Sequence, residues 1–209
     1  MRMAAMSGNW RRPPNDEWNS FDIRHSAFEI ILMSDEPIID LQSDHYFMGE
    51  ALRQAVKAYE AEEVPVGAVV VRNGRIIARA SNQVELLKDA TAHAEMLAIT
   101  QAEEAVGDWR LNDCTLYVTK EPCPMCAGAI VHVRFARVVF GASDPKAGAA
   151  GGAMNLLQFP TLNHQCAITN GVREEECRSL LQTFFASQRA AQKLEDQRKA
   201  AGNPPHSSN

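Results

Sequence analysis

The chain has 209 residues, 45% of them hydrophobic, which is enough for one domain with a buried core. No apolar run approaches the ~20 residues that cross a bilayer, and the first residues lack the apolar centre of a signal peptide, so we expect a cytoplasmic protein without a membrane span. The net charge of −5 argues against broad electrostatic affinity for nucleic acid, although not against one structured target.

Composition along the chain suggests three regions. Residues 1–42 mix Pro, Asn, Asp and Ser without a steady hydrophobic period, and we expect a flexible N-terminal extension there. Residues 43–190 carry the periodic patterns and are expected to form the folded domain. Residues 191–209 are expected to hold the end of the last helix and a flexible tail.

Hydrophobic patterning predicts a helix and then a β-hairpin at the start of the domain. Asp44 can cap a helix that runs to about Glu62, in which apolar residues recur at helical spacing. Residues 66–71 form a continuous apolar run, typical of a buried strand. Asn73-Gly74 is a strong hairpin signal, and residues 75–80 are expected to return as the second strand.

The rest of the domain alternates short apolar runs with amphipathic segments. We expect helices beginning near His93 and Cys123, strands over 115–118, 136–140 and 167–169, a short helix within 155–161, and a last helix reaching about 199. The loop 142–153 is rich in Gly and Ala, which predicts a close approach to another part of the molecule. This alternation after a hairpin predicts an α/β fold, a mixed sheet covered by helices.

Two short motifs together offer the ligands that zinc prefers. His93 lies in the stretch Thr91–Glu95, and Cys123 and Cys126 lie one helical turn apart around Pro124, which suits the first position of a helix. Zinc takes tetrahedral nitrogen and thiolate ligands, and a catalytic zinc keeps one position open for water. A zinc ribbon would need a second Cys pair, and a redox pair would not need His93. We therefore predict one catalytic Zn²⁺ per subunit, held by His93, Cys123 and Cys126.

Glu95 follows the predicted histidine ligand by two residues, so its carboxylate can reach past the metal towards a bound water. Zinc lowers the pKa of its bound water to about 7. A carboxylate beside the metal can take the proton from that water and pass it to the substrate. We therefore predict that Glu95 is the catalytic acid and base, a role that is compatible with capping the helix start.

The pattern His-x-Glu followed by Pro-Cys-x-x-Cys is the signature of zinc-dependent base deaminases. From about residue 45 to about residue 185 the sequence resembles the bacterial tRNA-specific adenosine deaminases, within the cytidine and deoxycytidylate deaminase superfamily. The resemblance rests on the segments 63–68, 91–95, 121–128 and 138–142, and on 144–151, which is more specific to the tRNA enzymes. It implies a three-layer α/β/α cytidine deaminase-like fold with a mixed five-stranded sheet.

The same resemblance implies a function and its partners. The reaction would be hydrolytic deamination of adenosine to inosine at the wobble position of a tRNA anticodon loop, by zinc-hydroxide attack with Glu95 as the proton shuttle. The partners would be the tRNA anticodon stem-loop and a second copy of the chain, in a homodimer whose partner helps to contact the RNA.

The resemblance also implies residues that line the substrate pocket. Asn82 matches the asparagine that holds the purine, although it also suits an ordinary turn. Val66 and Ala94 match positions in the pocket wall, for which a plain core or backbone role is the alternative. Phe184 and Phe185 match paired aromatic residues on the last helix. One of them is expected to pack in the core, and we take Phe185 as the one that flanks RNA.

Further matches concern the RNA itself. Asp144 matches a loop aspartate beside the flipped anticodon nucleotide, and Lys146 matches a nearby phosphate contact or is a solvated surface lysine. Asn163 and His164 match an RNA-facing segment, although His164 also suits a turn. Other positions depart from the pattern: Ser143 stands where the best-known bacterial members have a basic residue. Such departures do not affect the catalytic residues and concern the affinity for RNA.

Two other functions remain open from the sequence. A deaminase of a free nucleobase or nucleoside, such as guanine deaminase, shares the zinc motif and fits the low positive charge, but the loop 142–151 and the pair Asn163-His164 argue against it. A non-catalytic zinc-containing RNA-binding module is the second alternative. Glu95 argues against that module, because a structural zinc site has no use for it.

Overall fold

The computed structural model describes residues 40–202. The predicted N-terminal extension over 1–42 therefore lies outside the described residues except for 40–42, as does the segment 203–209 of the predicted tail. Among the described residues, no helix has both the length and the apolar character needed to cross a membrane.

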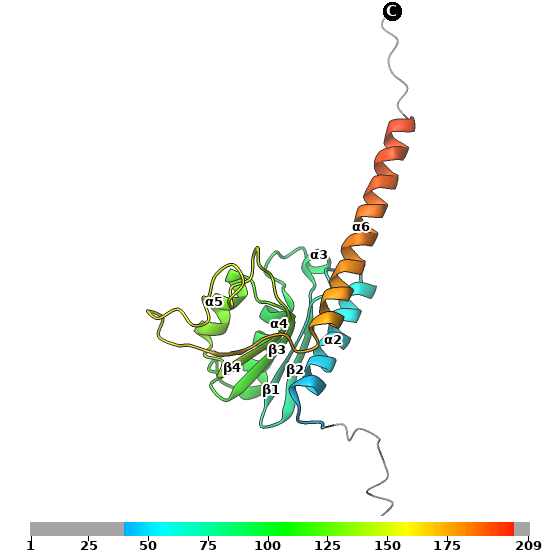
Figure 1. Cartoon of the computed structure of the whole chain (residues 1–209). Helices are drawn as coiled ribbons and strands as arrows, with labels where there is room; N and C mark the ends of the chain where they lie inside the picture. Colours follow the sequence, from blue (N-terminus) through cyan, green and yellow to red (C-terminus); the bar gives the residue numbers. More distant parts are fainter. Residues whose placement is uncertain (1–39, 203–209) are drawn as a thin grey trace, which may run out of the picture. The chain divides into compact units, whose positions relative to one another are not determined.

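A five-stranded mixed sheet lies at the centre of the domain (Figure 1). Its strands are β1 (Gly67–Arg72), β2 (Arg75–Ser81), β3 (Cys114–Lys120), β4 (Arg137–Ala142) and β5 (Ala167–Thr169), in the order β2-β1-β3-β4-β5. Strand β1 runs antiparallel to β2 and β3, whereas β3, β4 and β5 are parallel. Asn73 and Gly74 both have positive φ in the β1–β2 turn, as predicted for this hairpin.

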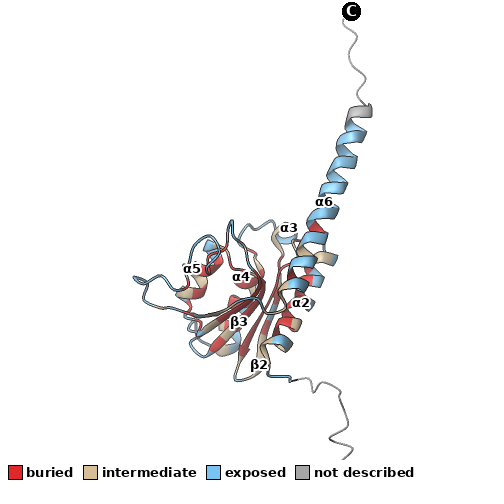
Figure 2. Cartoon of the chain, in the orientation of Figure 1, coloured by how far each residue is buried: buried red, intermediate tan, exposed pale blue. Residues whose placement is uncertain are grey.

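Helices cover both faces of this sheet, which confirms the predicted three-layer α/β/α fold. One layer holds α2 (Asp44–Glu60) and α6 (Glu174–Gly202), and the other holds α4 (Ala94–Val106) and α5 (Pro124–His132), while α3 (Val84–Leu87) is a single turn. Side chains alternate along β1, so that Val69 packs with the α2 side and Val70 with the α4 side. Figure 2 shows the buried residues on the strands and on the inner sides of the helices, while residues 185–199 of α6 are exposed.

The start of α2 differs from the prediction. Ser43, not Asp44, is the N-cap, and its Oγ accepts a hydrogen bond from the Tyr46 N–H at 3.2 Å. Asp44 accepts hydrogen bonds from the Tyr117 hydroxyl at 2.8 Å and from both terminal nitrogens of Arg137 at 2.8 and 2.6 Å. Both residue types suit an N-cap, and the distant partners of Asp44 decide between them.

The short helix predicted within 155–161 is wrong. The segment forms turns, and Ala150 pairs with Asn155 in an isolated bridge. The Asn155 Oδ1 accepts a hydrogen bond from the Gln158 N–H at 3.1 Å. Asparagine competes in this way with the helical backbone, because its side chain offers a local acceptor.

Candidate metal centre and active site

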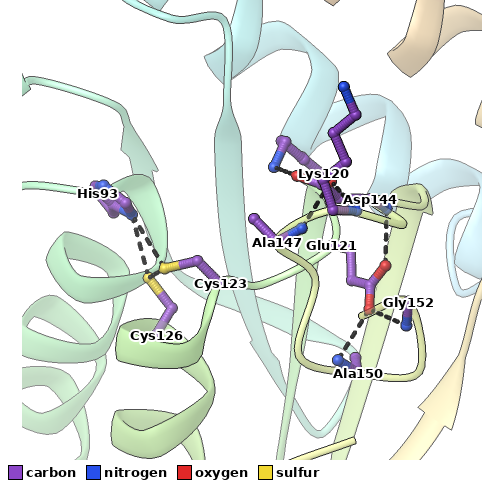
Figure 3. A network of polar contacts seen from close by, with 10 residues as sticks. His93, Lys120, Glu121, Cys123, Cys126, Asp144, Ala147, Ala150 and Gly152 are labelled. Atoms are coloured by element: carbon purple, nitrogen blue, oxygen red, sulfur yellow. Dashed lines mark hydrogen bonds and ion pairs between the residues drawn. The ribbon is translucent and has the colours of Figure 1, made fainter. Parts of the chain in front are cut away.

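The N-termini of two helices bring the predicted metal ligands together. His93 is the N-cap of α4 and Cys123 is the N-cap of α5, with Pro124 at the first helical position as predicted. Figure 3 shows the three side chains pointing towards one another. The two Sγ atoms are 3.6 Å apart, and the His93 Nδ1 lies 3.7 Å from the Sγ of Cys123 and 3.4 Å from that of Cys126.

These distances fit a zinc ion. A tetrahedron with Zn–S bonds of about 2.3 Å and Zn–N bonds of about 2.0–2.1 Å has edges of roughly 3.5–3.8 Å, close to those between the three ligand atoms. Across residues 40–202, His93, Cys123 and Cys126 form the one cluster of His, Cys and acidic side chains able to hold a metal ion. One nitrogen and two thiolates form a donor set that zinc prefers.

The contacts among these three side chains favour the negatively charged form of Cys123. The contact with the Cys126 thiol is the largest cause that lowers the pKa of Cys123, to about 3, and His93 acts in the same direction. The same thiol–thiol contact and burial raise the pKa of Cys126. Cys123 is therefore the first to become a thiolate, at the positive end of the α5 dipole.

Glu95 lies in the first turn of α4 and is only 4% exposed. Burial raises the pKa of its carboxyl group above the ordinary range. A carboxylate with a raised pKa binds a proton more readily at neutral pH, which suits a group that accepts and returns protons.

A cavity of about 350 Å³ contains Glu95 and two of the metal ligands. This volume lies within the range of small-molecule sites, about 300–1,000 Å³. It is lined by Glu63, Val64, Val66, Asn82, Val84, Glu85, His93, Glu95, Lys120, Glu121, Cys123 and Phe185. The structure therefore brings Val66, Asn82 and Phe185 to the lining of this cavity. Ala94 is fully buried in the core and is not part of the cavity lining.

Asn82 is held by a buried carboxylate that sequence reasoning missed. The Asn82 Nδ2 donates a hydrogen bond to Glu63 Oε2 at 3.1 Å, and Glu63 Oε1 accepts another from the Leu86 N–H at 2.7 Å. Glu63 is 2% exposed. Both of its oxygens are therefore engaged, and the Asn82 amide has one orientation. No local signal marks Glu63, because it follows the exposed Glu62 in an acidic pair just before β1.

Glu121 is a second buried carboxylate that the sequence did not single out. It accepts hydrogen bonds from the backbone N–H groups of Asp144 at 2.8 Å, Ala150 at 2.9 Å and Gly152 at 2.8 Å (Figure 3). A Cβ added at Gly148 would lie 2.2 Å from the Glu121 carboxylate carbon. The Gly- and Ala-rich loop therefore closes tightly around one side chain, which confirms the predicted close approach.

Asp144 lies in this loop and forms an ion pair with Lys120. The Lys120 Nζ is 2.5 Å from Asp144 Oδ2, and Asp144 Oδ1 accepts from the N–H groups of Lys146 at 3.0 Å and Ala147 at 3.1 Å. The hydrogen bond from Lys120 is the largest cause that lowers the pKa of Asp144. Lys146 is exposed and does not line the cavity.

Asn163 and His164 lie elsewhere. They line a different cavity, of about 400 Å³, together with Trp109 and residues of α5. His164 is half-buried, and its Nε2 lies 2.7 Å from the Phe135 carbonyl oxygen. The structure therefore does not bring these two residues into the cavity that holds the metal ligands.

The three-layer fold, the metal triad and the buried glutamate define a deaminase, and the MafB19-like deaminase family matches residues 42–196. A tRNA-specific adenosine deaminase of Bacillus subtilis (strain 168) is 54% identical over 153 residues, covering 73% of this chain and 95% of that protein. A solved structure from a study of A-to-I editing by tRNA:A34 deaminases at the wobble position of transfer RNA is 46% identical, with a TM-score of 0.63; the match covers 65% of this chain and 99% of the other. The chain belongs to the family of tRNA-specific adenosine deaminases.

The fold alone is shared more widely. A guanine deaminase from Nitrosomonas europaea is 24% identical, with a TM-score of 0.61 over 69% of this chain and 85% of its own. This likeness shows the same three-layer architecture and carries no conclusion about the substrate.

Proposed function

We propose that the protein converts the wobble adenosine of a tRNA anticodon loop to inosine by hydrolysis. The observation that carries this proposal is one cavity that contains Glu95, metal ligands and Asn82 together. The tRNA-specific deaminases to which the chain is similar support the choice of substrate.

The residues divide the chemistry between them. His93, Cys123 and Cys126 would hold a zinc ion, which would act as a Lewis acid and make hydroxide available from water near neutral pH. Glu95 takes a proton from the attacking water and passes it to the ring nitrogen beside the carbon under attack. Glu95 then takes the proton of the new hydroxyl group on that carbon and gives it to the departing amine as the C–N bond breaks, so that adenosine and water give inosine and ammonia. Asn82, oriented by Glu63, holds the edge of the purine.

An anticodon loop suits this cavity because its unpaired bases can be splayed out, whereas a duplex hides them. Phe185 is 43% exposed where it lines the cavity and offers an aromatic face beside the flipped nucleotide. Val66 lines the wall, and Ala94 is proposed to support it from the core. Asp144, Lys146, Asn163 and His164 are proposed as contacts to the rest of the RNA.

We also propose a homodimer in the cytoplasm. Apolar side chains on α5 and the loop after β4 are exposed, which supports an interface there; they are Met125 (36%), Met154 (50%), Phe159 (49%) and Leu162 (37%). All five cysteines are free, as expected in a reducing compartment.

One observation favours the alternative substrate, a free base. The cavity lining contains the four glutamates 63, 85, 95 and 121 but only one lysine or arginine, Lys120. A neutral base would enter such a cavity without electrostatic repulsion, whereas the glutamates would repel the negative charge of a phosphodiester.

A deamination assay separates these functions. The substrate is a synthetic anticodon stem-loop with adenosine at the wobble position, with free guanine, adenosine and cytidine beside it and Glu95→Ala as the inactive control. Inosine in the RNA alone is the expected result. Ammonia from a free base with the stem-loop unchanged would overturn the RNA substrate, and RNA binding by the zinc-loaded protein without any turnover would overturn the enzyme.

A further inference from the structure

Lys120 is the last residue of β3, next to the buried Glu121. Its side chain is 30% exposed, lines the active-site cavity, and places its Nζ 2.5 Å from Asp144 Oδ2. Figure 3 shows this pair beside the loop that Glu121 anchors. The ammonium is therefore held at one place on the cavity by a carboxylate from a neighbouring loop.

The surrounding contacts do not require Lys120 for closing the loop. Glu121 already accepts three backbone N–H groups from it, and the other oxygen of Asp144 accepts the N–H groups of Lys146 and Ala147. A partly exposed ion pair contributes little to stability. A purely structural role therefore leaves the position of this lysine on the cavity unexplained.

Charge gives it a role. A nucleotide whose base enters the cavity brings its two flanking phosphates to the rim. The four glutamates of the lining, three of them buried and Glu85 exposed, oppose the charge of these phosphates. Lys120 is the one lysine or arginine among the lining residues. A lysine ammonium is a compact point charge that binds phosphate oxygens well, and its long stem lets it turn from a carboxylate to a phosphate.

We propose that Lys120 is a substrate-binding residue that contacts a phosphate flanking the deaminated adenosine, and that Asp144 holds its ammonium ready at the rim. The assignment rests on the proposed function, because it requires a phosphodiester substrate. It supplies the positive charge that an acidic protein needs at the point where RNA enters.

The first test compares Lys120→Met with Lys57→Met, a matched loss of an exposed lysine on α2 outside the cavity lining. KM for the stem-loop is measured between about 0.05 and 0.5 M salt. One lost contact to a single strand lowers the slope of log KM against log salt by about 0.7. The KM of Lys120→Met is therefore expected to be about fivefold higher than that of the unmodified protein at ~0.1 M salt, and the two values should converge towards ~1 M. Lys120→Arg keeps the charge and is expected to keep the slope.

The second test changes the substrate in place of the protein. One flanking phosphate is replaced by an uncharged methylphosphonate, and the neighbouring 2′-hydroxyl is replaced by hydrogen in both the charged and the uncharged stem-loop. At one of the two flanking positions, the neutral linkage is expected to raise the KM of the unmodified protein about fivefold. The KM of Lys120→Met is expected to be the same for the charged and the neutral linkage, because the same contact cannot be removed twice.

Each outcome decides. A salt-independent loss in Lys120→Met, or an unmodified protein that is indifferent to a neutral linkage on either side, overturns the Lys120 assignment while the proposed function stands. If the unmodified protein does not deaminate the charged stem-loop, the proposed function fails and the assignment falls with it. The methylphosphonate measurement on the unmodified protein decides even if Lys120→Met does not fold.

Discussion

The buried carboxylate of Glu63 accepts a hydrogen bond from the Asn82 amide at 3.1 Å and so determines which way that amide faces the cavity. One amide N–H of Asn82 points to Glu63, which leaves its carbonyl oxygen and second N–H for a ligand. Because Glu63 is also tied to the Leu86 N–H at 2.7 Å, the pair cannot rotate freely.

Glu63→Gln is expected to weaken the reaction without removing the metal. Glutamine offers one acceptor, so one of the two donors, Asn82 or Leu86, faces an NH₂ group and loses its partner. A misplaced Asn82 lowers kcat/KM for the stem-loop by up to about a hundredfold.

The control for Glu63→Gln is Glu62→Gln, because Glu62 is the exposed neighbour of Glu63. Steady-state kinetics and the zinc content of both variants check the prediction. Equal kcat/KM in the two variants would show that Glu63 does not position Asn82 for the substrate.

Glu95→Gln is expected to keep about one zinc ion per chain and to lose turnover. Glutamine has nearly the same shape as glutamate but cannot carry a proton between water and the substrate, and general acid–base catalysis contributes about 10²–10⁴-fold. Metal analysis and single-turnover assays on the stem-loop measure the two quantities separately. Glu104→Gln, on the exposed side of the same helix α4, serves as the control. Turnover at the unmodified rate would remove Glu95 from the mechanism.

Glu121→Gln is expected to loosen the loop that follows β4. The carboxylate serves three backbone donors, at Asp144, Ala150 and Gly152, and a glutamine NH₂ group would face at least one of them. A buried donor left without an acceptor costs about 1–3 kcal/mol of the free energy of unfolding. Hydrogen exchange at those three amides should speed up, while the amides of β1 and β3 in the sheet keep their protection relative to global unfolding. Unchanged exchange in the loop would mean that other contacts hold it.

Local signals in the sequence predicted most of the fold and the meeting of the three candidate metal ligands. The β1–β2 hairpin follows from an apolar run and Asn73-Gly74, and the helix start that carries Cys123 follows from Pro124 at its first position. Each of the three candidate ligands lies at or near the start of a helix. Their spacing along the sequence was therefore enough to predict their positions. Such patterns survive without knowledge of the tertiary structure.

The residues that support the site could not be predicted in this way, because their partners are distant in sequence. Glu63 meets Asn82 nineteen residues later, and Lys120 meets Asp144 twenty-four residues later. A lone glutamate or lysine is usually solvated, and only the packed sheet brings these charges to their partners. The same limit applies to Asp44, whose partner Arg137 lies ninety-three residues away, whereas the helix predicted within 155–161 is replaced by the local hydrogen bond from Gln158 to Asn155.

Asp44→Asn is expected to destabilise the protein in a pH-dependent way. The hydrogen bonds from Arg137 are the largest cause that lowers the pKa of Asp44, and the Tyr117 hydroxyl adds to it. A carboxyl group whose pKa is lowered on folding stabilises the folded state above its unfolded pKa of about 3.9, and this stabilisation is lost as pH falls through the folded pKa. At pH 7 the variant should lose about 1–3 kcal/mol, because the charged hydrogen bonds between α2 and β4 are lost.

Urea unfolding of both proteins at a series of pH values measures this difference. It should be constant above about pH 5 and shrink below about pH 4, since protonated Asp44 resembles asparagine. Asp196→Asn, on the exposed part of α6, is the control and should change the free energy of unfolding by no more than about 0.5 kcal/mol. A difference between Asp44→Asn and the unmodified protein that stays the same down to the lowest pH would mean that the charge of Asp44 does not fasten α2 to the sheet.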